Sequence, residues 1–129
     1  MHGWAVVSAS TYEDDDSTMA GIVTRVRERV MELSSGNPDV RLFYVNGACH
    51  LTMTARPNHY GPAVQEVLDF WAWLGGVAPG SYGLMYVRDD EDPARSNEFV
   101  VHVLRRGKSA TEADSFLSPC VPVIEDAWR

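Results

Sequence analysis

Apolar residues along the chain change their spacing several times, and each change predicts a new element. Residues 2–9 contain a tryptophan and two valines, which favours a first strand. In the next segment apolar side chains recur every three or four positions, as they do along one side of a helix: Met19, Ile22, Val23, Val26, Val30 and Leu33. Acidic residues before this segment and Pro38 after it agree with the preferred ends of a helix.

The middle of the chain predicts a hairpin followed by a second helix. Residues 40–45 and 48–55 favour strands, and the Asn-Gly pair between them is typical of a two-residue hairpin turn. Residues 60–74 then show helical spacing, with Pro62 in the first turn, where proline is tolerated. One face of this second helix is apolar: Val64, Val67, Leu68, Trp71 and Leu74.

Two strands and a tail complete the pattern. Residues 81–88 and 97–106 flank a charged connection, which is typical of a hairpin with an acidic tip. Residues 108–114 are polar, and the pattern weakens there. Residues 116–124 are apolar but interrupted by prolines, so for them we expect an edge strand or an extended strap. The order predicts a two-layer α+β sandwich, with a mainly antiparallel sheet, two helices on one face and a C-terminal strap. A ferredoxin-like strand arrangement is permitted but not required by this order.

Length and composition restrict the class of protein. At 129 residues, of which 45% are hydrophobic, we expect a single domain over residues 1–129 with its own core. No apolar run approaches the roughly 18 to 20 residues of a membrane span. The start also lacks the features of a signal peptide, so we expect a cytoplasmic protein. In that compartment Cys49 and Cys120 are more typical of buried thiols than of a disulfide.

The charge balance indicates the kind of partner. The net charge is −7, from 11 basic and 18 acidic residues. This argues against direct binding of nucleic acid, because phosphate binding needs a clustered positive surface. It suits a basic protein partner, which a negative surface attracts over a distance.

Several short motifs lie along the chain, most densely in its last third. They are HGW at 2–4, YGLMYVRDDED at 82–92, NEF at 97–99, LRRG at 104–107, Asp114, LSPCVP at 117–122 and ED at 125–126. In this combination they resemble the family named immunity protein 7, from bacterial polymorphic toxin systems. The resemblance covers most of the chain, although the region between Gly36 and Gly80 contributes nothing to it.

The resemblance implies a small cytoplasmic antitoxin that is not an enzyme and needs no cofactor or metal. Such a protein binds the C-terminal toxin domain of a secreted effector, one to one, and neutralises it by occlusion. The toxins that such families guard are varied, and are often nucleases or nucleic-acid-modifying enzymes. The partner would then be a basic protein.

The tip of the last predicted hairpin carries four carboxylates in a row: Asp89, Asp90, Glu91 and Asp92. They are too costly to desolvate in a core, so they face water or a partner. Three interpretations are open. The tip is a solvated turn, in which one of the first two aspartates pairs with Arg88 or Arg105. It meets a basic toxin surface, where its acids pair with arginine or lysine. Or it binds Ca²⁺ or Mg²⁺, although EF-hand spacing is missing.

Two aromatic residues of the second helix form another candidate toxin-binding patch. Phe70 and Trp73 fall outside the apolar stripe, and exposed aromatic patches often mark binding sites. Alternatively, the tail at residues 116–124 covers them. A third alternative is a scaffold or homodimer that uses the same two side chains.

Charged residues near the end suggest a structural ion pair. Arg105 or Arg106 could bind Asp114 or Glu125 and so fasten the tail to the last strand, because the guanidinium fork suits carboxylates. Neighbouring residues of a strand face opposite sides, so only one of the two arginines is expected to do this.

An alternative function is a small enzyme or ligand-binding domain that uses the cleft between sheet and tail. Its best residues would be Glu98, His102 and Cys120. The histidines lack the spacing of zinc ligands, and the chain has no glycine-rich phosphate loop and no nucleophile elbow. We therefore favour the binding protein over the enzyme.

Overall fold

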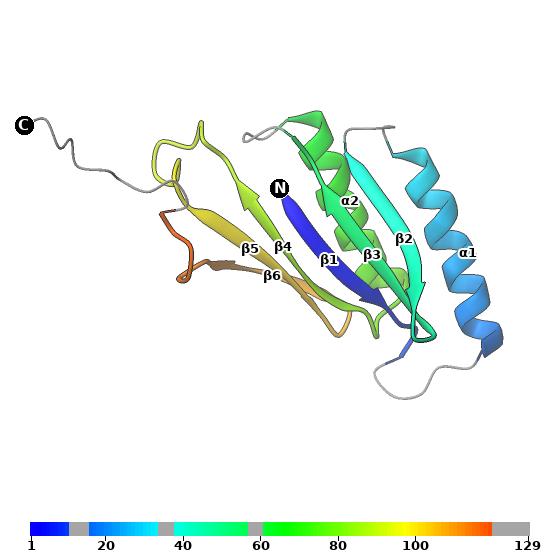
Figure 1. Cartoon of the computed structure of the whole chain (residues 1–129). Coiled ribbons are helices and arrows are strands. Elements are labelled where there is room, and N and C mark those ends of the chain that lie inside the picture. Colours follow the sequence, from blue (N-terminus) through cyan, green and yellow to red (C-terminus); the bar gives the residue numbers. More distant parts are fainter. Residues whose placement is uncertain (11–15, 34–37, 57–60, 120–129) are drawn as a thin grey trace, which may run out of the picture.

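The computed structural model describes residues 1–10, 16–33, 38–56 and 61–119 (Figure 1). The elements in chain order are β1 (His2–Val7), α1 (Asp16–Glu32), β2 (Asp39–Val45), β3 (Ala48–Thr54), α2 (Pro62–Val77), β4 (Tyr82–Arg88), β5 (Phe99–Arg105) and β6 (Lys108–Ala113). The strands form one six-stranded antiparallel sheet, and both helices pack against it. The predicted α+β class is confirmed. Of the predicted tail, residues 120–124 lie outside the described part of the chain.

The strand order of the sheet is β2-β3-β1-β4-β5-β6. In its first four strands, β1 and β2 run parallel with β3 between them, and α1 makes the connection. This is the split βαβ of the ferredoxin-like arrangement that the element order permits. Strands β5 and β6 extend the sheet beyond β4.

Two hairpin turns of the same kind fix the register at the two ends of the sheet. Asn46 and Gly47 have φ angles of 51° and 78°, so the predicted two-residue turn is confirmed as one that needs positive φ at both positions. Arg106 and Gly107 repeat these angles, at 51° and 77°, between β5 and β6. The sequence pattern missed β6 because every one of its side chains is exposed and none alternates toward a core.

The core lies between the helices and one face of the sheet. Strand side chains on this face are buried: Ala5, Val7, Cys49, Leu51, Met53, Met85, Val87 and Leu104. The helices contribute Ile22, Val23, Val26, Val64, Val67, Phe70, Trp71 and Leu74. Burying each large apolar side chain contributes roughly 1.5–3 kcal/mol to folding. Cys49 is a free buried thiol, as the compartment argument predicts.

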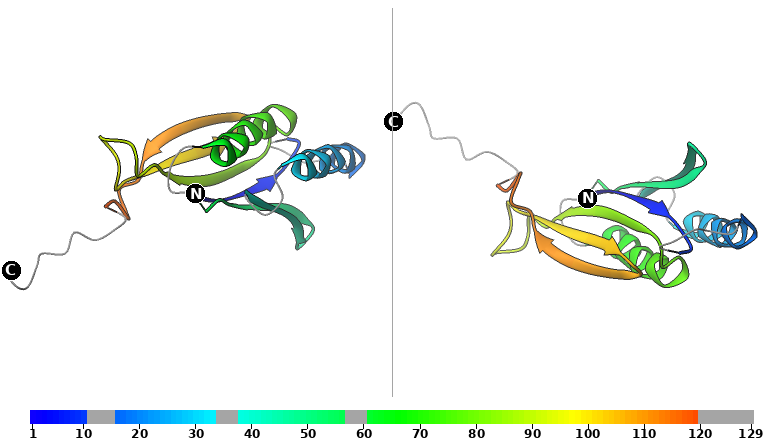
Figure 2. Two further views of the ribbon diagram at one scale, coloured as in Figure 1. Left: turned by 90° about the horizontal axis from the view of Figure 1, so that it is seen from above. Right: turned by 90° about the horizontal axis from the view of Figure 1, so that it is seen from below.

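The sheet curls around α2, so that β5 and β6 approach the end of this helix (Figure 2). Gly75 makes the approach possible. A Cβ atom at this position would lie 2.9 Å from the carbonyl oxygen of Gly107 and 3.1 Å from Cδ1 of Leu104. The helix and the β5–β6 turn therefore touch through backbone atoms.

The prediction that Phe70 belongs to an exposed aromatic patch is wrong. Its side chain is 0% exposed, and its ring lies 5.9 Å from that of Trp73. Trp73 is partly buried, and the guanidinium of Arg29 lies 5.4 Å from its ring centroid. Because α1 packs beside α2, α1 helps to cover Phe70 and Trp73. The apolar pattern of α2 alone does not reveal a cover from another helix.

Candidate interaction site

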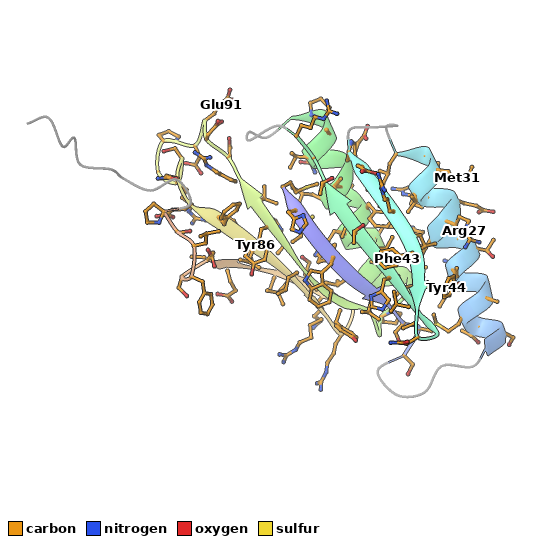
Figure 3. All side chains as sticks on the ribbon, in the orientation of Figure 1. Arg27, Met31, Phe43, Tyr44, Tyr86 and Glu91 are labelled. Atoms are coloured by element: carbon orange, nitrogen blue, oxygen red, sulfur yellow. The ribbon has the colours of Figure 1, made fainter. Side chains whose placement is uncertain are left out.

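The face of the sheet turned away from the helices is covered by neither of them, and we call it the open face. Figure 1 shows its strands in front of α2. Strand side chains alternate between the two faces, so the neighbours of the core residues point to this side. Its large exposed side chains include Trp4 at 41%, Phe43 at 40%, Val45 at 43% and Tyr82 at 50% exposure. In Figure 3 the labels of Phe43 and Tyr86 mark two of its strands, β2 and β4.

The strand register arranges the open face in cross-strand rows. One row consists of Phe43, His50, Val6, Tyr82, Arg105 and Lys108. The next consists of Arg41, Thr52, Trp4, Leu84, Val103 and Ala110. Aromatic contacts hold the rings in place: Trp4 and Tyr82 meet edge to face at 6.3 Å, and Phe43 stacks on His50 at 5.7 Å. The result is a surface on which aromatic and aliphatic side chains alternate with polar and charged ones.

Charged side chains of the open face stand at its margins. Asp39 and Arg41 lie on the edge strand β2, and Lys108 and Glu112 lie on the edge strand β6. Arg105 and Arg88 stand at the ends of β5 and β4. Asp39 and Arg41 form an ion pair, with Oδ2 and Nη2 3.2 Å apart. An aromatic centre with a charged rim is the composition of protein–protein interfaces, in which charged residues are depleted at the core.

The acidic loop, residues 89–98, is the second candidate surface. Two of its predicted toxin contacts shape the loop itself. Asp89 Oδ1 accepts the backbone N–H of Glu91 at 3.1 Å, and Asp92 Oδ1 accepts that of Ala94 at 2.9 Å. Asp90 and Glu91 are exposed, and Figure 3 shows Glu91 at the outer end of the loop. These two carboxylates are therefore the ones free to meet a partner.

The structure bears on two of the interpretations of the acidic loop, the ion pair with an arginine and the metal site. Nε of Arg88 donates to the carbonyl oxygen of Ser96 at 3.0 Å. Among the described residues no ion pair joins Asp89 or Asp90 to Arg88 or Arg105. Nor do the described residues contain three or more His, Cys, Asp or Glu side chains grouped as a metal site.

A pocket of about 240 Å³ lies between the loop and the helix-side face of β5. Its lining consists of Val87, Asp89, Asp92, Arg95, Glu98, Val100, His102 and Thr111. Nε2 of His102 is buried and has no hydrogen-bond partner among the described residues. Burial lowers the pKa of His102, so the imidazole is neutral at pH 7. The pocket thus brings Glu98 and His102 together, whereas Cys120 lies outside the described residues.

The predicted ion pair between Asp114 and Arg105 or Arg106 is wrong. Asp114 follows β6 and donates its backbone N–H to Phe99, at the start of β5. Arg105 is six residues further along β5, which is about 20 Å of extended strand. Asp114 is 7% exposed. Its carboxylate instead accepts the backbone N–H groups of Phe116 and Leu117, at 3.2 and 2.8 Å. The other predicted partner, Glu125, lies outside the described residues.

Sequence reasoning missed the open face, although a signal for it was present. A strand with one wet face alternates apolar and polar residues. The segment from Tyr82 to Val87 is apolar at almost every position, and residues 4–7 are apolar throughout. When a strand has apolar side chains on both faces, both faces are expected to pack against something. The two helices pack against only one face of this sheet.

Comparison with known proteins assigns the chain to a family. Neither a search of curated proteins nor a search of solved structures found a match. Among the described helices, none combines the length and apolar character needed to cross a membrane. The model of one protein family, described as Immunity protein 7, matches residues 1–126. Such families are typically non-enzymatic inhibitors of toxins, and this chain belongs to the immunity protein 7 family.

Proposed function

We propose that this protein neutralises a cognate toxin domain by binding it one to one and occluding a surface that the toxin needs. The observation that carries the proposal is the family match over residues 1–126. A purely steric mechanism requires a large binding surface and no catalytic group. The aromatic open face meets the first requirement.

The acidic loop supports a basic toxin as the partner. Asp90 and Glu91 project from a loop that its own turns hold in place, and the whole chain carries a charge of −7. Such a surface accelerates the approach of a basic protein, because electrostatic steering acts mainly on association. Nucleases and nucleic-acid-modifying enzymes are basic where they bind phosphate, so a toxin of that class fits the charge.

Co-expression tests the proposal directly. The partner to test is the C-terminal domain of a large secreted protein encoded next to this gene. We expect the domain to be toxic when it is expressed alone. Cells that also express this chain should survive, and the two proteins should co-purify at equal stoichiometry. Rescue by substoichiometric amounts of this chain, with a chemically altered toxin, would contradict occlusion.

A further inference from the structure

We propose that the toxin domain docks on the open face, with an apolar patch on the aromatic centre and carboxylates opposite Arg105 and Lys108. This inference rests on the proposed function and names the surface that performs it. The acidic loop is not part of this surface. The pocket beneath the loop is lined by side chains on the helix-side face of β5, which is the opposite side of the sheet.

The aromatic side chains of the open face have the chemistry of a binding surface. Trp4 and Tyr82, on the inner strands β1 and β4, and Phe43, on the edge strand β2, are each 40–50% exposed on the same face of the sheet. Tryptophan and tyrosine are the residue types most enriched among side chains that dominate binding energies. Here ring contacts at 5.7 and 6.3 Å already order these side chains, so a partner would not have to immobilise them on binding.

The open face has the size of a protein–protein interface. The strands contain six or seven residues each. With inter-strand spacings of about 4.8 Å and a rise of about 3.3 Å per residue, the face measures roughly 24 by 20 Å in projection. Side chains make the accessible area larger than this projection, which brings it close to the ~800 Å² that each partner buries in a standard interface. One protein domain would cover the face.

The charge of the open face is opposite in sign to that of the whole chain. The six charged side chains of the open face are four cations and two carboxylates, on a chain whose net charge is −7. Arg105 and Lys108 stand directly opposite each other across β5 and β6. Like charges in such a pair destabilise a hairpin. Carboxylates of a partner placed against these two cations would attract both of them and so offset their mutual repulsion.

A second copy of this chain fits the face less well. Of the carboxylates that a second open face would offer, Asp39 is already paired with Arg41. Only Glu112 would be left to meet Arg105 and Lys108. The toxin domain is therefore the occupant that the charges favour.

The test measures the affinity of purified variants for the toxin domain defined above. Trp4→Ala and Tyr82→Ala should each weaken binding by at least about tenfold, mainly through faster dissociation. Arg105→Glu should weaken it by about the same factor. Two controls change exposed side chains of α1: Met31, which is 79% exposed, and Arg27. Met31→Ala and Arg27→Glu should alter the affinity less than twofold.

Each outcome decides the inference. Tight binding by all the open-face variants, or equal losses in the α1 controls, would overturn the docking surface and leave the proposed function intact. If the unmodified protein itself fails to bind or to rescue cells, the proposed function fails and the inference with it. A free protein that is dimeric by sedimentation, and that Tyr82→Ala converts to a monomer, would assign the face to a second copy.

Thermal unfolding of each variant checks that the fold persists. If Trp4→Ala unfolds, the affinity of Tyr82→Ala, changed at a half-exposed position, is the measurement that decides.

Discussion

The two faces of the sheet are both apolar, but only one of them is needed to build the fold. On the helix side Leu51, Met53 and Met85 are completely buried beneath α1 and α2. On the open side Trp4 and Tyr82 are about half exposed, and neither helix covers them. The same kinds of side chain therefore contribute stability on one face and form the proposed binding surface on the other. We propose that the toxin binds the face that neither helix covers.

The largest expected difference between the faces is in stability. Phe70→Ala removes a fully buried ring and should lower the free energy of unfolding by about 3–5 kcal/mol. Tyr82→Ala, on the open face, should lower it by less than about 1 kcal/mol. Urea denaturation of the two variants and the parent measures both values. Similar losses in the two variants would show that the open face also belongs to the structural core.

A pair of glycines in α2 tests the contact between this helix and the β5–β6 turn. Gly75→Ala places a methyl group 2.9 Å from a backbone oxygen and should destabilise the protein by about 1–3 kcal/mol. Gly76→Ala meets nothing within 4 Å and should stabilise it by up to about 1 kcal/mol, because alanine favours a helix. Thermal melts of both variants show the sign. A stable Gly75→Ala variant would contradict the close packing of helix and turn.

Charge reversal in the acidic loop should separate approach from docking. Asp90→Lys with Glu91→Lys changes carboxylates that are exposed, whereas Asp89 and Asp92 hold the loop turns. We expect toxin association to slow by about three- to tenfold at low salt, with little change in dissociation and a weaker salt dependence. Stopped-flow mixing at several ionic strengths measures this. An unchanged association rate would remove the loop from the encounter with the toxin.

The smallest expected effect is a pH dependence due to His102. Burial lowers the pKa of His102 below its ordinary value of 6.5 in the folded chain, so the unfolded chain takes up a proton first. The stability from this residue is complete above pH 6.5 and decreases as the pH falls through the lowered folded-state pKa. His102→Gln should remove that part of the dependence. Equal slopes of stability against pH in the variant and the parent would contradict the buried neutral state.

Regular patterns made most of the fold predictable from the sequence. The helical stripes, the Asn-Gly turn and the alternation in β3 depend on neighbours in the chain, and all three appear in the structure. Strand β6 was missed because a strand with only exposed side chains depends on backbone pairing with β5, and its residues show no pattern. Long-range packing decided the remaining errors. The burial of Phe70 involves the other helix, and the distance of Arg105 from Asp114 depends on the β5–β6 register.

The candidate site was predictable only in part. A run of four acidic residues marked the loop, but the sequence did not show that Asp89 and Asp92 are used within it. The open face depends on how six strands align, so residues as distant as Phe43 and Arg105 enter one row only after folding.

Two adjacent residues of β2 allow the most direct test of docking on the open face. Phe43 points to the open face and is 40% exposed, while Tyr44 points to the helix side and is 57% exposed. The measurement is the dissociation constant of the toxin complex for Phe43→Ala and for Tyr44→Ala. We predict a loss of about fivefold or more for Phe43→Ala and less than twofold for Tyr44→Ala. The reverse order, or equal losses, would contradict docking on the open face.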